Sequence, residues 1–159
     1  MTAWPLHIVL YQPEIPQNTG NIGRTCVAVG AKLWLVQPLG FQLDDRRLQR
    51  AGLDYWKHLD YQIVADWSAL LREMRGDTRY WLFTKRAPAT FWDATFARGD
   101  ALVFGSESRG LPHRLLDDSE ARPIRIPQHS AVRSLNLASA VAAGAYEAAR
   151  QIGGFSGQE

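Results

Sequence analysis

The sequence predicts an α/β fold with a mostly parallel sheet covered by helices on both faces. Short runs rich in Val, Leu, Ile and aromatic residues alternate along the chain with segments whose apolar residues recur at helical spacing. Several of these runs end in loops that carry glycine, proline and polar residues, as strand ends do in α/β proteins. An alternation of strands and helices places parallel strands side by side and packs the helices against them.

Six strands and four helices are expected. The strands are predicted at residues 6–11, 33–37, 61–64, 79–84, 101–104 and 123–126. The helices are predicted at residues 21–29, 44–50, 66–74 and 134–152.

Local signals support the helices in order. The first helix follows a loop over residues 13–20, and Gly30 stands where a helix commonly ends. The second begins with acidic residues and ends with basic ones, the order that the helix dipole favours. Asp66 is expected to cap the third. The fourth, the longest, is predicted to carry Ser134 and Asn136 in its first turn.

Size and composition indicate an ordinary globular domain. The chain has 159 residues, of which 46% are hydrophobic and 21% charged, and we expect one domain over residues 1–152 with a loose tail at 153–159. The net charge of +2 permits a local basic surface for nucleic acid without requiring one. We expect no membrane-spanning run and no signal peptide, so a cytoplasmic location is predicted.

Cysteine and histidine usage argues against disulfide and metal chemistry. Cys26, the single cysteine, excludes an intrachain disulfide, suits a reducing compartment, and falls on the apolar face of the first helix. The four histidines show no metal-ligand spacing, so no metal site is predicted.

Three loops at strand ends are expected to form a ligand pocket. They lie within residues 102–112, 124–127 and 133–137. Gly105 and Gly110 have the spacing of a phosphate-binding loop, but Leu111 and Pro112 stand where Lys and Ser or Thr would be needed. Glu107 would also repel a polyphosphate. The pocket is therefore predicted to take a ligand other than a nucleoside triphosphate.

Two other classes of enzyme lack their motifs here. No Gly-x-Ser-x-Gly sequence supports a serine hydrolase at residues 105–110, and residues 13–23 lack the Gly-x-Gly-x-x-Gly of a dinucleotide oxidoreductase. A non-catalytic RNA-binding dimer stays open, because sequence alone does not establish turnover.

The chain resembles the SPOUT superfamily of RNA methyltransferases, and within it the small tRNA 2′-O-methyltransferases that modify the wobble nucleotide. The resemblance covers residues 6–151 and rests on 13–24, 52–55, the three loops and the 146–151 segment of the last helix. It implies a deep C-terminal trefoil knot, a homodimer, and S-adenosyl-L-methionine as the cofactor. The implied substrate is C34 or U34 in the anticodon loop of a bacterial tRNA, with a leucine acceptor expected. An exposed anticodon loop offers accessible bases and ribose hydroxyls.

The resemblance also implies cofactor-contacting positions. They are Leu82, Gly105, Ile126 and Ser134, with Leu135 and Asn136 alongside. Gly105 would let the backbone pass close to the ligand. Glu107 has two interpretations: it faces the sulfonium or amino group of the cofactor, or it pairs with Arg109 in solvent.

The RNA-facing and catalytic candidates are Asn18, Asn21 and Arg24, together with Tyr146. Asn21 and Arg24 are three residues apart and share a helical face. Arg24 can clamp a phosphate or orient the ribose hydroxyl, whereas an arginine of ordinary pKa cannot act as a base. Further candidates for phosphate contact are Arg46, Arg47, Arg50, Lys85, Arg86 and Arg133.

The last helix is unusually thin. Its alanines and Gly144 allow another backbone to approach, either in a crowded core or at a two-fold interface that Tyr146 and Arg150 could serve. Two positions depart from the family pattern, Trp34 and Gln128, and both are placed where substrate choice could differ.

Overall fold

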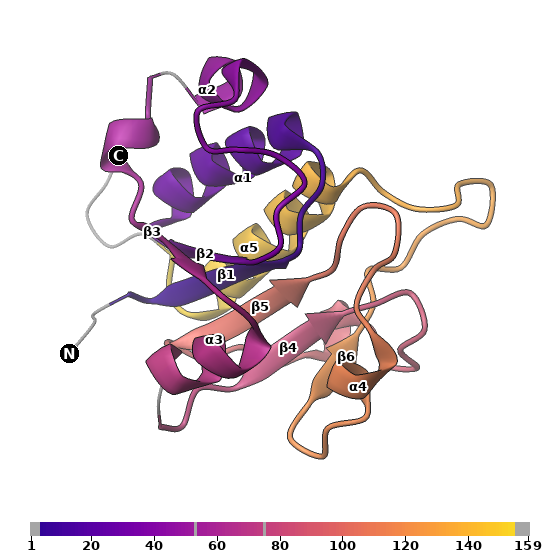
Figure 1. Cartoon of the computed structure of the whole chain (residues 1–159). Helices are drawn as coiled ribbons and strands as arrows, with labels where there is room; N and C mark the ends of the chain where they lie inside the picture. Colours follow the sequence, from indigo (N-terminus) through magenta and orange to yellow (C-terminus); the bar gives the residue numbers. More distant parts are fainter. Residues whose placement is uncertain (1–3, 53, 75, 155–159) are drawn as a thin grey trace.

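A single parallel sheet organises the molecule. The computed structural model describes residues 4–52, 54–74 and 76–154. Its six strands have the order β3-β2-β1-β5-β4-β6, and every neighbouring pair is parallel (Figure 1). The strands are β1 (Leu6–Tyr11), β2 (Lys32–Val36), β3 (Tyr61–Val64), β4 (Tyr80–Phe83), β5 (Asp100–Phe104) and β6 (Arg122–Ile124). The predicted α/β class is confirmed; the trefoil knot is not established by this strand order and stays a prediction.

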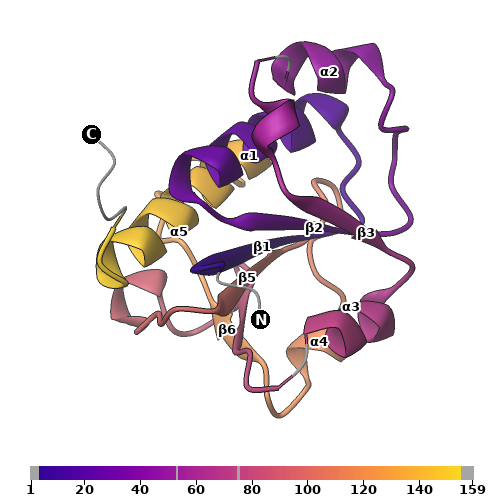
Figure 2. The same cartoon turned by 90° about the vertical axis from the view of Figure 1, so that its left-hand side faces the viewer.

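Helices cover both faces of the sheet, as predicted. In Figure 2, α1 and α5 lie on one face with α2 beside α1, and α3 and α4 lie on the other. The helices are α1 (Pro16–Val29), α2 (Arg46–Gly52), α3 (Trp67–Met74), α4 (His113–Leu116) and α5 (Leu137–Gln151). The short α4 and two 3₁₀ turns, Trp56–His58 and Phe91–Asp93, were not predicted.

The first helix begins earlier than the sequence suggested. A loop was predicted over residues 13–20, but α1 starts at Pro16, where the missing N–H of proline costs no helical hydrogen bond. Gly20 lies inside the helix at the place where α2 packs against it. A Cβ on Gly20 would lie 2.6 Å from the Ala51 Cβ, so this position has no room for a side chain. Gly30 ends the helix in the left-handed conformation, with φ of 71°, as predicted.

The last helix begins later than predicted. Ser134 and Asn136 precede α5 instead of forming its first turn. The Asn136 side-chain oxygen accepts hydrogen bonds from the backbone N–H groups of Ala138 and Ser139, at 2.9 and 3.3 Å, and so caps the helix. The predicted cap of α3 is confirmed, since Asp66 Oδ1 accepts from the Ala69 N–H at 2.8 Å.

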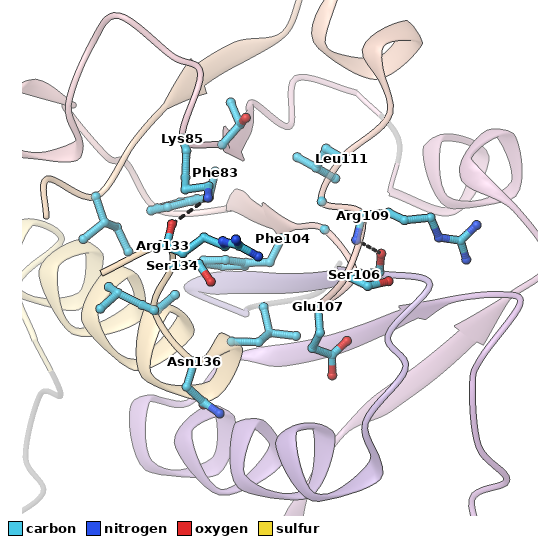
Figure 3. A pocket seen from close by; sticks show the side chains of 18 of the residues that line it. Phe83, Lys85, Phe104, Ser106, Glu107, Arg109, Leu111, Arg133, Ser134 and Asn136 are labelled. Carbon is cyan, nitrogen blue, oxygen red and sulfur yellow. Dashed lines mark hydrogen bonds between the residues drawn. The ribbon is translucent and has the colours of Figure 1, made fainter. Parts of the chain in front are cut away.

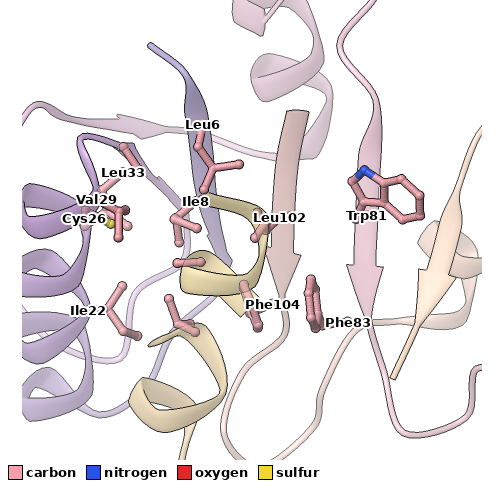
Figure 4. Close-up of a cluster of buried hydrophobic side chains, with 14 of the residues drawn as sticks. Leu6, Ile8, Ile22, Cys26, Val29, Leu33, Trp81, Phe83, Leu102 and Phe104 are labelled. Carbon is pink, nitrogen blue, oxygen red and sulfur yellow. The ribbon is translucent and has the colours of Figure 1, made fainter. Parts of the chain in front are cut away.

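Two hydrophobic clusters lie on opposite faces of the sheet. The cluster beneath α1 and α5 contains Leu6, Ile8, Ile22 and Phe104 (Figure 4), and the other contains Val9 and residues beneath α3 and α4. All six residues of β1 are buried, as expected for a parallel strand covered on both sides.

The small residues of α5 face the core of their own chain. Ala145 and Ala148 are fully buried, and a Cβ at Gly144 would lie 3.0 Å from the Phe83 ring. The crowded-core interpretation therefore accounts for this face of the helix. Tyr146 and Arg150 are exposed on the other face, where the predicted dimer contact would have to form.

A buried carboxylate joins the beginnings of β4 and β5. Asp100 is only 3% exposed and accepts hydrogen bonds from Arg79 Nε at 2.9 Å and Arg79 Nη2 at 2.6 Å. It also accepts from Trp81 Nε1 at 2.8 Å and the Ala97 N–H at 2.9 Å. One side chain thus satisfies four donors.

Replacing Asp100 with alanine should lower the free energy of unfolding by about 2–4 kcal/mol, because the half-buried Arg79 guanidinium and the buried Trp81 indole N–H lose their acceptor. Urea denaturation checks this, with Asp118→Ala as the control. Asp118 is exposed, and among the hydrogen bonds described its carboxylate accepts only from the Glu120 N–H, at 2.9 Å. Equal losses in the two variants would contradict the role given to the Asp100 cluster.

A buried histidine should make the fold sensitive to acid. His7 Nδ1 accepts a hydrogen bond from Trp34 Nε1 at 3.1 Å, and burial, aided by the charge of Lys32, lowers the pKa of His7 from 6.5 to about 4. Above pH 6.5 His7 is neutral in both the folded and the unfolded state, and the folded state has its full stability. As the pH falls from 6.5 towards 4, the unfolded chain takes up a proton that the folded state does not, and the free energy of unfolding falls by about 3 kcal/mol at most.

Denaturation at several pH values tests this expectation. His7→Gln retains an acceptor for the Trp34 indole but does not titrate, so the wild type should lose more stability than this variant between pH 6.5 and 4. Parallel pH profiles would show that His7 does not set the acid limit.

Candidate functional site

A cavity of about 510 Å³ opens at the carboxyl ends of β4, β5 and β6. Its walls come from all three loops singled out in the sequence (Figure 3), and Ile15 and Asn18 at the beginning of α1 complete it. The carboxyl edge of a parallel sheet is the usual position of ligand sites in α/β folds. The predicted pocket is therefore present.

The cavity combines apolar walls with a polar rim. The rings of Phe83 and Phe104 stack in one wall with centroids 4.4 Å apart, and Ile126 and Leu135 contribute aliphatic surface. At the rim, Lys85 Nζ donates a hydrogen bond to the Arg133 carbonyl at 2.6 Å and ties the two loops together (Figure 3). Such a site suits a ligand with a flat, largely apolar ring and a polar remainder.

Glu107 has a role that neither interpretation from the sequence anticipated. Its two carboxylate oxygens accept hydrogen bonds from the backbone N–H groups of Glu14 and Ile15, each at 2.9 Å. These groups lie at the start of α1, where no side chain of the helix itself serves as a cap. The Glu107 charge therefore stabilises a helix N-terminus, and the hydrogen bonds of its carboxylate go to Glu14, Ile15 and Asn18 and not to Arg109, the partner in one of the two interpretations.

The contact between these two segments is reciprocal. Glu14 Oε1 accepts from Ser108 Oγ at 2.6 Å and from the Ser108 N–H at 3.2 Å. These bonds lower the pKa of Glu14 from its ordinary value. The β5 loop and the beginning of α1 are thus fastened to each other beside the pocket.

Asn18 links three segments of the site. Its Nδ2 donates to Glu107 at 3.1 Å, and its Oδ1 accepts from Asn136 Nδ2 at 3.1 Å. Only 6% of Asn18 is exposed. The two asparagines therefore hold the beginning of α1, the β5 loop and the start of α5 in fixed positions around the cavity.

Gly105 is required by the course of its own loop. A Cβ at this position would lie 2.1 Å from the Gly110 carbonyl carbon and 2.4 Å from the Leu111 nitrogen. The sequence suggested that this glycine admits a ligand close to the backbone. The segment that approaches it is the returning chain of residues 110–111.

Most of the cofactor candidates converge on the cavity, but Leu82 does not. The lining includes Gly105, Glu107, Ile126, Ser134, Leu135 and Asn136. Leu82 is 1% exposed and packs on the α3 and α4 side of the sheet. Side chains alternate along a strand, so the neighbouring Phe83 faces the pocket instead. Phe83 was not singled out from the sequence, although the alternation of side chains along β4 could have identified it.

Three of the catalytic candidates lie outside the cavity of their own chain. Asn21 and Arg24 are exposed on α1, and the Arg24 guanidinium stacks over the Tyr55 ring, 5.0 Å from its centroid. Tyr146 is 49% exposed on α5. Of the four, only Asn18 lines the pocket.

Several other expectations concern groups elsewhere in the chain. Within residues 4–52, 54–74 and 76–154, no cluster of three His, Cys, Asp or Glu side chains could hold a metal ion. None of the helices described there is long and apolar enough to cross a membrane. Cys26 is fully buried, and burial raises the pKa of its thiol, so it is not an available nucleophile.

Over most of its length the chain matches a family of RNA-methylating enzymes. Residues 5–146 match the model of the SpoU rRNA Methylase family, and the chain belongs to that family.

Individual relatives are similar over almost the whole chain. A tRNA (cytidine(34)-2′-O)-methyltransferase of Burkholderia cenocepacia is 47% identical over 150 residues, covering 92% of this chain and 96% of the relative. The enzyme of the same name from Saccharophagus degradans is 42% identical, and the match covers 96% of this chain and 99% of the relative.

Solved structures agree in fold. One, described as giving structural insights into the 2-OH methylation of C/U34 on tRNA, superposes with a TM-score of 0.88 at 49% identity and covers 92% of this chain and 95% of its own. An AdoMet-bound rRNA methyltransferase from Sinorhizobium meliloti superposes with a TM-score of 0.81 at 26% identity. The match covers 91% of this chain and 56% of that protein.

Proposed function

We propose that this protein is an S-adenosyl-L-methionine-dependent methyltransferase that modifies the 2′-hydroxyl of the wobble nucleotide, C34 or U34, of tRNA. The observation that carries the proposal is the similarity at 49% identity, over 92% of the chain, to a structure concerned with that reaction. Curated relatives of matching length have the same activity in their names. A leucine tRNA is the expected substrate, and the cytoplasm, where tRNA is modified, the expected location.

The pocket has the chemical features that this cofactor needs. Stacked Phe83 and Phe104 offer an apolar surface for adenine, and Ser134 offers a polar group at the rim. Arg109 supplies positive charge for a carboxylate. The bound cofactor would supply an activated methyl group on its sulfonium, so the protein's own residues need only bind, align the ribose hydroxyl and accommodate one proton.

We further propose that the enzyme is a homodimer in which Arg24 and Tyr146 reach the pocket of the partner subunit. Both side chains are exposed and lie outside the cavity of their own chain. A role in catalysis therefore requires a second copy to bring them to a pocket. Within such a site, Arg24 would orient the RNA by charge and hydrogen bonds, since it cannot accept a proton. The proposed catalytic domain spans residues 1–152; of the proposed tail at 153–159, residues 155–159 lie outside the described part of the chain.

Light scattering should give about twice the 17.9 kDa mass of one chain. We expect this mass because Arg24 and Tyr146, the proposed catalytic side chains, lie outside the pocket of their own chain, so that a complete site needs two copies. A fully active monomer at micromolar concentration would contradict the dimer.

Methyl transfer to unmodified tRNA tests the proposed activity directly. Incubation with labelled cofactor, nuclease digestion and mass spectrometry should place one methyl group on the ribose of nucleotide 34. A methyl on a base, or on a ribose outside the anticodon loop, would refute the substrate assignment and retain the methyltransferase. Binding of tRNA without transfer would favour the non-catalytic alternative.

A further inference from the structure

Trp92 is the most exposed large hydrophobic side chain among the described residues, with 69% of its surface accessible. The other five tryptophans are buried or half-buried. A single exposed apolar residue is common on protein surfaces. The inference therefore depends on where Trp92 lies, how firmly it is held and which charges surround it.

Trp92 stands at the outer end of a row of aromatic rings that begins in the pocket wall. Its ring centroid lies 6.2 Å from that of Phe91, and Phe91 lies 6.4 Å from Phe83. Phe83 in turn stacks on Phe104, and both line the cavity (Figure 3). The row leads from the proposed methyl-transfer site to the protein surface.

The turn that carries Trp92 is hydrogen-bonded to Arg125, the residue that follows β6. The Phe91 N–H donates to the Arg125 carbonyl at 2.9 Å, and the Arg125 N–H donates to the Ala89 carbonyl at 3.0 Å. The Arg125 guanidinium also donates to the carbonyls of Ala87 and Pro88 at 3.0 and 2.6 Å. A turn whose backbone is already fixed needs little further ordering when a ligand stacks on its side chain.

The segment between the pocket and Trp92 is positively charged. Lys85 and Arg86 are both exposed, and both line the pocket as well. The turn also carries one acidic side chain, Asp93, whose carboxylate accepts from the Thr90 hydroxyl at 3.2 Å, so residues 85–93 keep a net charge of +1. An exposed aromatic face with cations beside it is the combination that binds single-stranded nucleic acid.

We propose that Trp92 stacks on an unpaired base of the substrate RNA that neighbours the methylated nucleotide, while Lys85 and Arg86 contact the intervening phosphates. The proposal rests on the proposed function, which makes RNA the substrate. It adds a specific aromatic platform outside the pocket, which would help to hold the loop of the RNA open.

Binding of an unmodified anticodon stem-loop RNA tests the platform. Trp92→Ala should weaken RNA binding about five-fold or more, the range expected for the loss of one base–aromatic stack. Trp92→Phe keeps an aromatic face and should stay within about two-fold of the wild type. The KM for RNA should rise in Trp92→Ala, whereas kcat at saturating RNA and affinity for S-adenosylhomocysteine should not change.

A set of RNAs that each lack one loop base identifies the base that stacks. Removing that base should weaken binding to the wild type and abolish the difference between the wild type and Trp92→Ala. A difference that persists with every such RNA would overturn the stacking role.

The remaining outcomes separate this inference from the proposed function. If the wild type methylates tRNA and Trp92→Ala binds RNA equally well, the platform alone is wrong. If Trp92→Ala lowers the mass of the assembly to that of one chain, Trp92 is a contact between copies and the proposal fails. If the wild type binds no RNA, both the platform and the proposed function fail.

Discussion

Gly105→Ala should abolish cofactor binding, although it adds only one methyl group. The new Cβ would lie 2.1 to 2.6 Å from backbone atoms of Gly110 and Leu111, and backbone cannot move aside as the end of a flexible side chain can. The loop over residues 106–111 would have to shift, and it forms one wall of the cavity. Calorimetry with S-adenosylhomocysteine should detect no binding at concentrations that saturate the wild type.

Gly30→Ala is the matched control for this variant. It also adds one methyl group, but nothing lies within 4 Å of the new atom, and the strain arises only from the positive φ of 71° at the end of α1. Gly30→Ala should therefore lose some stability and keep its cofactor affinity. If Gly105→Ala bound the cofactor product normally, the proposed ligand would not occupy this cavity.

Strand positions followed readily from the sequence because a buried parallel strand is a local pattern. Residues 6–11 and 61–64 were predicted as β1 and β3 are observed, since short runs made mostly of apolar and β-branched or aromatic residues stand between turn residues. The start of α1 was missed for the opposite reason. Gly20 is a poor helix residue in isolation, and the space that it leaves is used by Ala51 of α2, a contact that sequence does not display.

The sequence predicted which segments form the candidate site better than it predicted the contacts between them. Its three loops were found because polar residues follow apolar runs, and parallel strands bring their carboxyl ends to one edge. The binding partners of Glu107 could not be found in this way, because its hydrogen bonds reach Glu14 and Ile15 across more than 90 residues of chain. Leu82 shows a further limit of prediction from sequence, since matching a family motif does not say which of two neighbouring side chains faces the cavity.

Arg24→Ala should bind the cofactor product like the wild type yet lose about 100-fold or more in kcat. The expected size is that of removing one preorganised group that acts on the reacting centre. The side chain lies outside the cavity of its own chain, so cofactor binding should not depend on it. Loss of both cofactor binding and transfer would instead show that Arg24, through its contact with Tyr55, maintains the fold.

A mixed dimer of Arg24→Ala and Gly105→Ala chains distinguishes a shared site from a site within one chain. If Arg24 acts in the partner's pocket, one site of the mixed dimer combines an intact pocket with an intact arginine, and the other site has both defects. Differently tagged chains, purified as the mixed dimer, should then regain about half of the wild-type activity, although each variant alone is inactive. If Arg24 acted within its own chain, both sites would be defective and mixing would restore nothing. Restoration would thus place the arginine of one subunit at the pocket of the other, and would explain why a side chain needed for transfer lies outside the cavity in a single copy.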